Sequence, residues 1–204
     1  MGKAISRLVA RAPWAWPVIS RPVKSFFDSR AKGWDSNTGA GSAEHLAPLA
    51  AGVLRAGKDP ERVLDIGCGT GAATFFLARE YPRARIRGVD LSPVMIDQAN
   101  SRIGLDPEAR VAFRVGDAGK LPYPDEHFDL VTQTNMPVFF AEIDRVLRSG
   151  GSVVIASSSG QNTPFSTPDD LLGKKFGKLG FSGVETGTAA RGTYFAARKK
   201  GLPE

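Results

Sequence analysis

Short apolar runs alternate with helical patterns along most of the chain, and this alternation predicts an α/β fold. The runs that fit buried strands cover residues 62–66, 85–89, 111–115, 128–132 and 152–157. Helices are predicted at 43–55, at 72–79, after Ser92–Pro93, at 141–148 and at 168–179. Strands separated by helices pair in parallel, whereas the last two predicted strands, 181–188 and 192–198, form an antiparallel hairpin.

The first 24 residues combine a basic row with an apolar row at helical spacing. Basic residues recur every four positions from Lys3 to Arg11, the apolar residues between them fall on the opposite side, and Pro13 ends this short helix. Two tryptophans and two aliphatic residues follow, then Arg21 and Lys24. Aromatic residues beside basic ones are typical of a peripheral membrane contact, which we expect through residues 1–24. The alternative is an arm that packs on its own domain with its basic side in water.

A polar stretch rich in glycine and serine, residues 36–42, follows this arm. It is typical of a mobile loop, either a lid that closes over bound substrates or a plain linker. Ser42 is the predicted N-cap of the helix at 43–55. The sequence therefore predicts a basic, aromatic arm and lid over residues 1–41 and one domain over residues 42–204.

The charge and the cysteine content limit which binding partners and which cellular compartment we expect for this protein. The 204 residues carry a net charge of +6 at pH 7, with no acidic residue before Asp28. The positive charge is the only feature that suggests binding to nucleic acid. We therefore expect no nucleic-acid partner. The single cysteine, Cys68, excludes a disulfide within the chain and favours a reducing, cytoplasmic compartment. No apolar run approaches the roughly 20 residues that span a bilayer, and we expect no metal site.

The segment Asp65-Ile66-Gly67-Cys68-Gly69-Thr70-Gly71 joins the first strand to the next helix. Glycines at such a turn allow a ligand to approach the backbone, and a nucleotide is the ligand typical of this place in an α/β fold. Gly67, Gly69 and Ala72 also fit the dinucleotide fingerprint, so the loop alone does not separate nicotinamide cofactors from others.

Two carboxylates further along the chain add to this pattern. Asp90 ends the second strand, where it can accept both ribose hydroxyls, and Asp117 follows the third strand, where it can accept an exocyclic adenine amine. With them the chain resembles the class I S-adenosylmethionine-dependent methyltransferases, in the small-molecule branch similar to quinone-biosynthesis enzymes. The resemblance is carried by the segments 65–71, 88–92, 116–118, 121–122, 128–129, 145–148 and 150–151.

This resemblance implies a Rossmann-like, seven-stranded, mostly parallel sheet with a C-terminal antiparallel hairpin and helices on both faces. It implies S-adenosyl-L-methionine as the cofactor. The residues expected to bind it are Asp65, Gly67, Cys68, Gly69, Thr70, Gly71, Asp90, Leu91, Met95, Asp117, Ala118 and Gln133. Asp65 matches the family's acidic position near the methionine amine, and Leu91 and Met95 are placed to flank the adenine.

The sequence defines the methyl acceptor less closely than the cofactor. Residues 129–145, which include the end of the fourth predicted strand, form a segment about seven residues shorter than ordinary loop lengths predict. No Asn-Pro-Pro-Tyr or Asp-Pro-Pro-Tyr motif is present, which argues against amino methylation of adenine or glutamine. Trp34, Phe139, Phe140 and Phe165 are candidates either for the wall of an apolar pocket or for core and lid packing. The general base is His45, Asp35 or none. We therefore expect in-line methyl transfer to a small, apolar or phenolic, quinone-like acceptor.

Two alternatives stay open at this point. One is a protein that binds S-adenosylmethionine or S-adenosylhomocysteine without catalysis. The other is an NAD(P)-dependent oxidoreductase that uses the same glycine loop, although no Tyr-Lys pair or other hydride-transfer site is evident.

Overall fold

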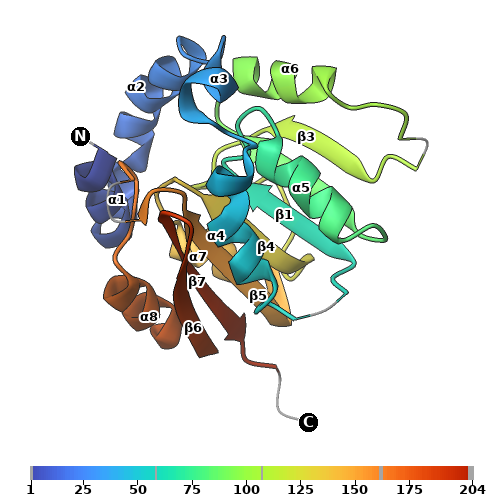
Figure 1. Cartoon of the computed structure of the whole chain (residues 1–204). Coiled ribbons are helices and arrows are strands. Elements are labelled where there is room, and N and C mark those ends of the chain that lie inside the picture. The colour runs from blue at the N-terminus through green and yellow to red at the C-terminus, as the bar shows by residue number, and fades with distance from the viewer. Residues whose placement is uncertain (1, 58, 107, 161–162, 202–204) are drawn as a thin grey trace.

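The computed structural model describes residues 2–57, 59–106, 108–160 and 163–201. Its seven-stranded sheet has the order β3-β2-β1-β4-β5-β7-β6 (Figure 1). The strands are β1 (Arg62–Ile66), β2 (Arg85–Asp90), β3 (Val111–Val115), β4 (Phe128–Thr134), β5 (Leu147–Ser157), β6 (Phe181–Ala189) and β7 (Gly192–Lys199). Strands β1 to β5 are parallel, and β7 runs antiparallel to both of its neighbours. The predicted sheet and terminal hairpin are confirmed.

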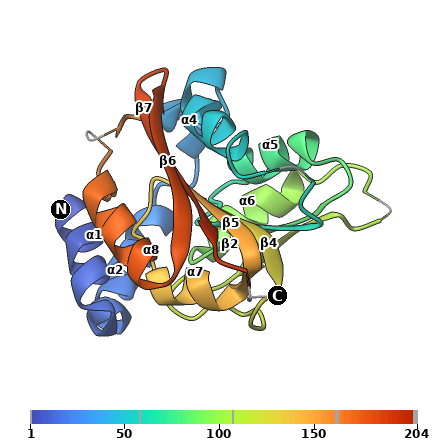
Figure 2. The same cartoon turned by 90° about the horizontal axis from the view of Figure 1, so that it is seen from below.

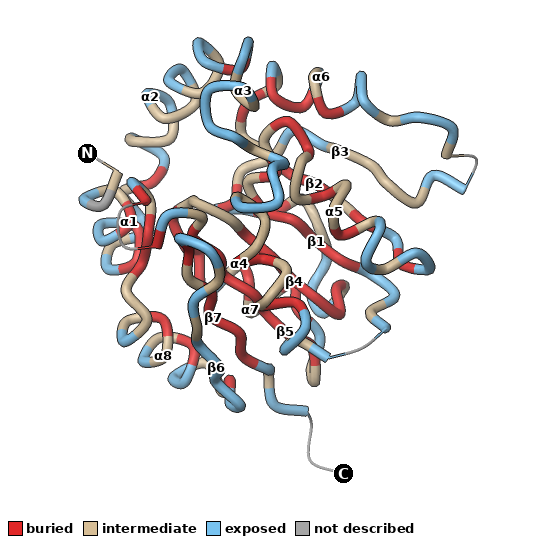
Figure 3. Tube along the Cα trace, in the orientation of Figure 1, coloured by how far each residue is buried: buried red, intermediate tan, exposed pale blue. Residues whose placement is uncertain are grey.

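Helices cover both faces of the sheet (Figure 2). One face carries α4 (Ala43–Val53) and α5 (Ala72–Glu80), and the other carries α7 (Phe140–Val146) and α8 (Asp169–Lys178). Successive side chains of a strand point to opposite faces of the sheet. In β1, Val63 packs under α4 and α5, whereas Leu64 packs in the core under α7 and α8. This double cover explains why the central strands are buried along nearly their whole length (Figure 3).

The helix α6 (Pro93–Ser101) lies beside β2 and β3 (Figure 1). Its predicted N-cap is confirmed, because the hydroxyl of Ser92 accepts a hydrogen bond from the Met95 amide at 3.2 Å. The hydroxyl of Ser42 accepts from the His45 amide in the same way at the start of α4. Both helices therefore begin where the sequence indicates.

The N-terminal arm is more helical than expected. It comprises α1 (Gly2–Arg11), the short 3-10 turn η1 (Pro13–Ala15), α2 (Trp16–Asp28) and α3 (Trp34–Thr38). The sequence did not predict α2, because Pro17 and Pro22 argue against a helix. Pro17 falls in the first turn, where no amide is needed, and apolar residues at positions 16, 19, 23 and 27 carry the helical spacing. The expectation of a loop over 36–42 was wrong for its first three residues, which belong to α3.

The arm packs on the domain with its apolar side inward. Val9 and Ala10 of α1 are buried in the main core, while Arg7 and Arg11 are exposed. Trp16 is also buried, so only Trp14 of the two tryptophans lies outside. Within the described residues, no helix combines the length and the apolar character needed to cross a bilayer.

The boundary between α7 and β5 also differs from the expectation. The sequence predicted a helix to residue 148 and a break at Ser149–Gly151, but α7 ends at Val146 and β5 begins at Leu147. Leu147 pairs with Phe128 of β4, and the register shifts before Leu130 pairs with Ser152. The shift in register is accommodated in β5 near Gly150, which has a φ of 77°.

Candidate active site

The turn between β1 and α5 exposes backbone to a large cavity. Gly67, Gly69 and Gly71 have φ values of 70°, 52° and 90°, in the region that favours glycine. A Cβ on Gly67 would collide with the Met136 sulfur, and one on Gly71 would lie 2.7 Å from the Phe113 ring. The nearest atom to a Cβ on Gly69 is Trp34 Nε1, at 4.0 Å. Packing therefore requires two of the glycines, whereas Gly69 leaves free space for a ligand.

Asp90, at the end of β2, holds this turn in place. One carboxylate oxygen accepts the Gly69 amide at 2.9 Å, and the other accepts the Ser92 amide at 2.9 Å. Burial raises the pKa of Asp90, while these two amide bonds act in the opposite direction. Each oxygen keeps a further lone pair, so the carboxylate can accept hydroxyl groups from the cavity side.

Asp65 lies behind the turn rather than on the cavity. It is 1% exposed and accepts hydrogen bonds from the hydroxyls of Thr74 at 2.6 Å and Thr132 at 3.3 Å. Burial raises its pKa to about 7. The carboxylate therefore joins β1, α5 and β4 beneath the glycine turn, consistent with a structural contribution.

This raised pKa predicts a defined dependence of stability on pH. Between the unfolded pKa near 3.8 and the folded value of about 7, the folded chain holds a proton on Asp65 that the unfolded chain releases. The contribution of Asp65 to the free energy of unfolding therefore falls as pH rises through this window, by at most about 1.4 kcal/mol per pH unit, and levels off above it.

Urea unfolding from pH 5 to pH 8 tests this dependence. The stability of wild type relative to Asp65→Asn is expected to decrease over that range. Asp97→Asn, which removes an exposed carboxylate on α6, should leave the profile of the wild type unchanged. Parallel profiles for wild type and Asp65→Asn would contradict the assignment.

Asp117 is engaged by the N-terminal arm. Its Oδ1 accepts the indole N–H of Trp16 at 2.5 Å and the amide of Gly119 at 2.7 Å. The Trp16 ring also packs edge-on against Phe139, with ring centroids 4.9 Å apart. The sequence placed Asp117 opposite an adenine amine and Trp16 at a membrane surface, but the structure joins the two residues.

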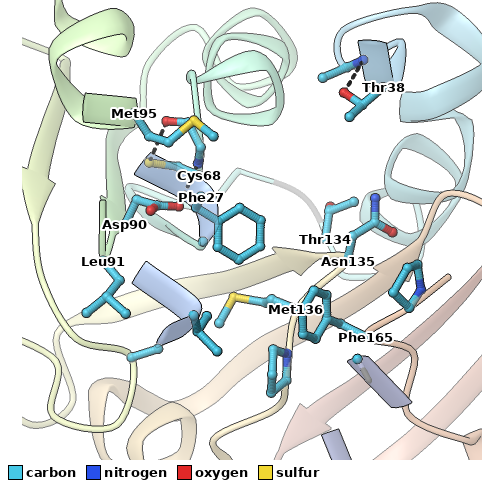
Figure 4. A pocket seen from close by; sticks show the side chains of 18 of the residues that line it. Phe27, Thr38, Cys68, Asp90, Leu91, Met95, Thr134, Asn135, Met136 and Phe165 are labelled. Carbon is cyan, nitrogen blue, oxygen red and sulfur yellow. Dashed lines mark hydrogen bonds between the residues drawn. The ribbon is translucent and has the colours of Figure 1, made fainter. Parts of the chain in front are cut away.

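The cavity at this end of the sheet has a volume of about 850 Å³ (Figure 4). Small-molecule sites usually range over roughly 300–1,000 Å³. The structure brings most of the predicted residues to its wall: His45, Gly67, Cys68, Gly69, Thr70, Asp90, Leu91, Met95 and Ala118. It does not bring Asp65, Gly71, Asp117 or Gln133 there, and Gln133 is buried with its side-chain amide donating to the Met136 carbonyl at 3.2 Å.

The far wall of the cavity is mainly apolar and comes from segments outside the glycine turn. The arm contributes Ile19, Val23, Phe27 and Trp34. The segments after β4 and before α8 contribute Met136 and Phe165, which lie on the same side of the cavity in Figure 4. Of the four aromatic residues that were candidates for this wall, Trp34 and Phe165 line the cavity, whereas Phe139 and Phe140, at the start of α7, pack in the core.

A polar group interrupts this apolar wall at the end of β4. The Thr134 hydroxyl is buried and has no hydrogen-bond partner among the described residues. Next to it, Asn135 adopts a φ of 58°, donates to the Ser158 hydroxyl at 2.9 Å and accepts the Ser158 amide at 2.8 Å. Buried polar groups are usually paired, so the unpaired Thr134 hydroxyl is a candidate ligand contact.

Two polar anchors hold the arm over the glycine turn. Asp28 at the end of α2 accepts a hydrogen bond from the Ser92 hydroxyl at 2.5 Å. Asp35 in α3 accepts from the Thr70 hydroxyl at 2.5 Å and forms an ion pair with Arg102. The sequence did not reveal these anchors, because more than 30 residues separate the partners in each pair.

Titratable groups on the described cavity wall are limited to His45, Cys68 and Asp90. Burial lowers the pKa of His45, so its imidazole is neutral at pH 7. Burial also raises the pKa of the Cys68 thiol well above its ordinary value, which keeps it protonated. Among the described residues, no group of three or more His, Cys, Asp or Glu side chains is placed to bind a metal ion.

Comparison with known proteins shows a family match for the segment that contains the glycine turn. Residues 63–151 match the family described as "Methyltransferase domain". The chain is 36% identical over 152 residues to an arsenite methyltransferase of Halobacterium salinarum, which covers 70% of this chain and 36% of that protein. It is 32% identical over 161 residues to a demethylmenaquinone methyltransferase of Deinococcus radiodurans, which covers 76% of this chain and 60% of that protein.

Solved structures share the fold. Phosphoethanolamine N-methyltransferase 2 of Haemonchus contortus, in complex with S-adenosyl-L-methionine, aligns with a TM-score of 0.67 and 18% sequence identity over 96% of this chain and 60% of that chain. The chain spans about a third to three fifths of the length of the first curated relatives. The glycine turn and the strand-end carboxylate lie within residues 63–151, and this segment of the chain belongs to the methyltransferase domain family.

Proposed function

We propose that this chain transfers a methyl group from S-adenosylmethionine to a small, largely apolar acceptor. The observation that carries the proposal is a single cavity with two unlike walls. One wall is the glycine turn with Asp90, and the other is an apolar surface from the arm and the segments around Met136 and Phe165.

The residues of the first wall fit the cofactor of the family. The space beside Gly69 lets a ligand approach the backbone, and the Asp90 carboxylate can accept the ribose hydroxyls. Leu91 and Met95 line the adjoining part of the wall, where an adenine ring can pack. When bound, S-adenosylmethionine supplies an electrophilic methyl group on a sulfonium.

The second wall supports the choice of acceptor. Its aromatic and aliphatic side chains favour an apolar ring or chain, and they exclude water from the reacting atoms. The unpaired hydroxyl of Thr134 offers one hydrogen bond, which suits a phenol, a quinol or another acceptor with a single polar group. Proximity and orientation can supply roughly 7–11 kcal/mol in such a site.

His45 is the proposed proton acceptor for a hydroxylated substrate. It lies on the cavity wall, and its lowered pKa keeps the imidazole free of a proton at neutral pH. In His45→Gln, methylation of a phenol should fall while S-adenosylhomocysteine affinity stays unchanged. An equal rate in the variant would remove His45 from the mechanism.

The test of the function is an acceptor screen with methyl-labelled S-adenosylmethionine, including phenols, quinols, fatty acids and amines. We expect label transfer to a phenolic or quinol compound. Thr134→Val, which removes the hydroxyl but keeps the shape, should reduce kcat/KM for that compound about tenfold, and Thr134→Ser should restore most of it. Tight cofactor binding without transfer to any compound would favour a non-catalytic binding protein.

A further inference from the structure

The N-terminal helices have two different sides. Toward the domain, Ile5, Ile19, Val23 and Phe27 line the cavity. Away from the domain, the same segment exposes apolar and basic side chains together. This outward surface, here called the docking surface, consists of Arg7, Leu8, Arg11, Trp14, Val18 and Arg21.

The apolar members of the docking surface are unusually exposed. Trp14 is 81% exposed, Val18 78% and Leu8 42%. At that exposure, Trp14 in the short turn η1 gains little packing from the described residues. Isolated apolar residues on a surface need no explanation, but three within 11 positions that include a tryptophan are typical of a contact site.

The charge of the docking surface has a single sign. No acidic residue occurs before Asp28, and Asp28 is held by Lys24 at 2.5 Å and by the Ser92 hydroxyl. Within the described parts of the chain, Arg7, Arg11 and Arg21 form no ion pair. Their guanidinium groups therefore remain available to an anionic partner.

We propose that the docking surface binds the headgroup region of an anionic lipid bilayer. Tryptophan favours the interface between headgroups and acyl chains, and arginine is attracted to anionic lipids. The contact is peripheral, because the described helices include none that could cross a bilayer. Both kinds of side chain come from α1, η1 and α2, which form one continuous part of the molecule in Figures 1 and 2.

The location of the docking surface has a consequence for the acceptor. Because α1 and α2 form both the docking surface and part of the cavity wall, docking brings the apolar cavity next to the lipid. An acceptor dissolved in the bilayer would then have a short path to the cavity. This consequence rests on the proposed function, whereas docking itself can be measured without any methyl transfer.

Vesicle flotation tests the proposal on the full chain. Vesicles of phosphatidylglycerol and phosphatidylcholine in equal amounts should carry the protein, and vesicles of phosphatidylcholine alone should carry little. The triple variant R7Q/R11Q/R21Q should lower the partition constant on the order of 100-fold, and W14S/V18S about tenfold, because each removes one component of interfacial binding.

Matched variants elsewhere on the molecule act as controls. R79Q/R83Q/R85Q removes three exposed arginines near α5 and β2, and L54S/L105S removes two exposed leucines. Both should float like wild type. Circular dichroism should be unchanged for every variant, because all of the substituted side chains are exposed.

Three results would overturn the proposal. One is the absence of flotation with anionic vesicles. Another is an equal loss of binding in both arginine variants, which would show a response to net charge alone. The third is a dimer that W14S/V18S dissociates while wild type fails to float, which would assign the docking surface to a second copy of the chain.

Discussion

Replacing Gly69 with alanine is expected to weaken the binding of S-adenosylhomocysteine about 100-fold. Gly69 has a φ of 52°, and the nearest atom to an added Cβ lies 4.0 Å away, so the methyl group would fit the folded chain but occupy space needed by the ligand. Overpacking a close contact costs about 1–3 kcal/mol. A 100-fold loss of affinity corresponds to about 3 kcal/mol, at the upper end of that range. Isothermal titration calorimetry measures the affinity directly.

Backbone strain has to be separated from this steric effect. Alanine in a left-handed conformation costs roughly 1–2 kcal/mol of stability wherever it occurs. Gly180→Ala provides the matched control, because Gly180 has a φ of 85° and nothing within 4 Å of an added Cβ. Both variants should lose similar stability, but only Gly69→Ala should lose affinity. An unchanged affinity in Gly69→Ala would show that no ligand approaches this backbone.

Asp90→Asn is expected to lower the affinity for S-adenosylhomocysteine about 10- to 100-fold. The asparagine has nearly the same shape, but it has one acceptor oxygen where the carboxylate has two. It cannot satisfy the amides of Gly69 and Ser92 and also accept two ribose hydroxyls. Hydrogen bonds to a charged group contribute about 1.5–3 kcal/mol each, which sets the size of the expected loss.

The control for Asp90→Asn is Asp97→Asn, which removes one negative charge from the exposed side of the neighbouring helix α6. Its affinity should match that of wild type. If both variants lost affinity equally, a general effect of charge would explain the result. If neither did, the ribose assignment of Asp90 would be wrong.

The sheet and the position of the glycine turn could be predicted from the sequence because they depend on local patterns. Buried parallel strands appear as short apolar runs, and Ser42 and Ser92 mark helix starts through their own hydroxyls. The three glycines of the turn likewise mark positions where the backbone has a positive φ, a conformation that other residues rarely adopt. These features need no knowledge of distant partners.

The arm could not be predicted to the same extent, because its structure depends on contacts between distant residues. The anchors from Asp28 to Ser92 and from Asp35 to Thr70, and the contact from Trp16 to Asp117, leave no local pattern. The prolines of α2 also obscured its helical spacing. As a result, the sequence left a membrane surface and the domain as alternative contacts for Trp16, and the structure buries it against the site.

The same limitation applies to the acceptor side of the cavity. Phe139 and Phe140 follow β4 closely in sequence, and their apolar character favours core or lid packing without excluding a pocket wall. The direction of the chain after Asn135 decides between these positions, since it brings Met136 to the cavity and the two phenylalanines into the core at the start of α7. The unpaired hydroxyl of Thr134 is likewise a property of the packed structure.

We propose that the glycine turn and Asp90 form the wall of the cavity that binds S-adenosylmethionine. Parallel calorimetric titrations of the full chain with S-adenosylhomocysteine and with NADH test it most directly. We expect saturable binding of one S-adenosylhomocysteine per chain, weakened in Asp90→Asn, and no binding of NADH. Binding of NADH in preference to S-adenosylhomocysteine would contradict it.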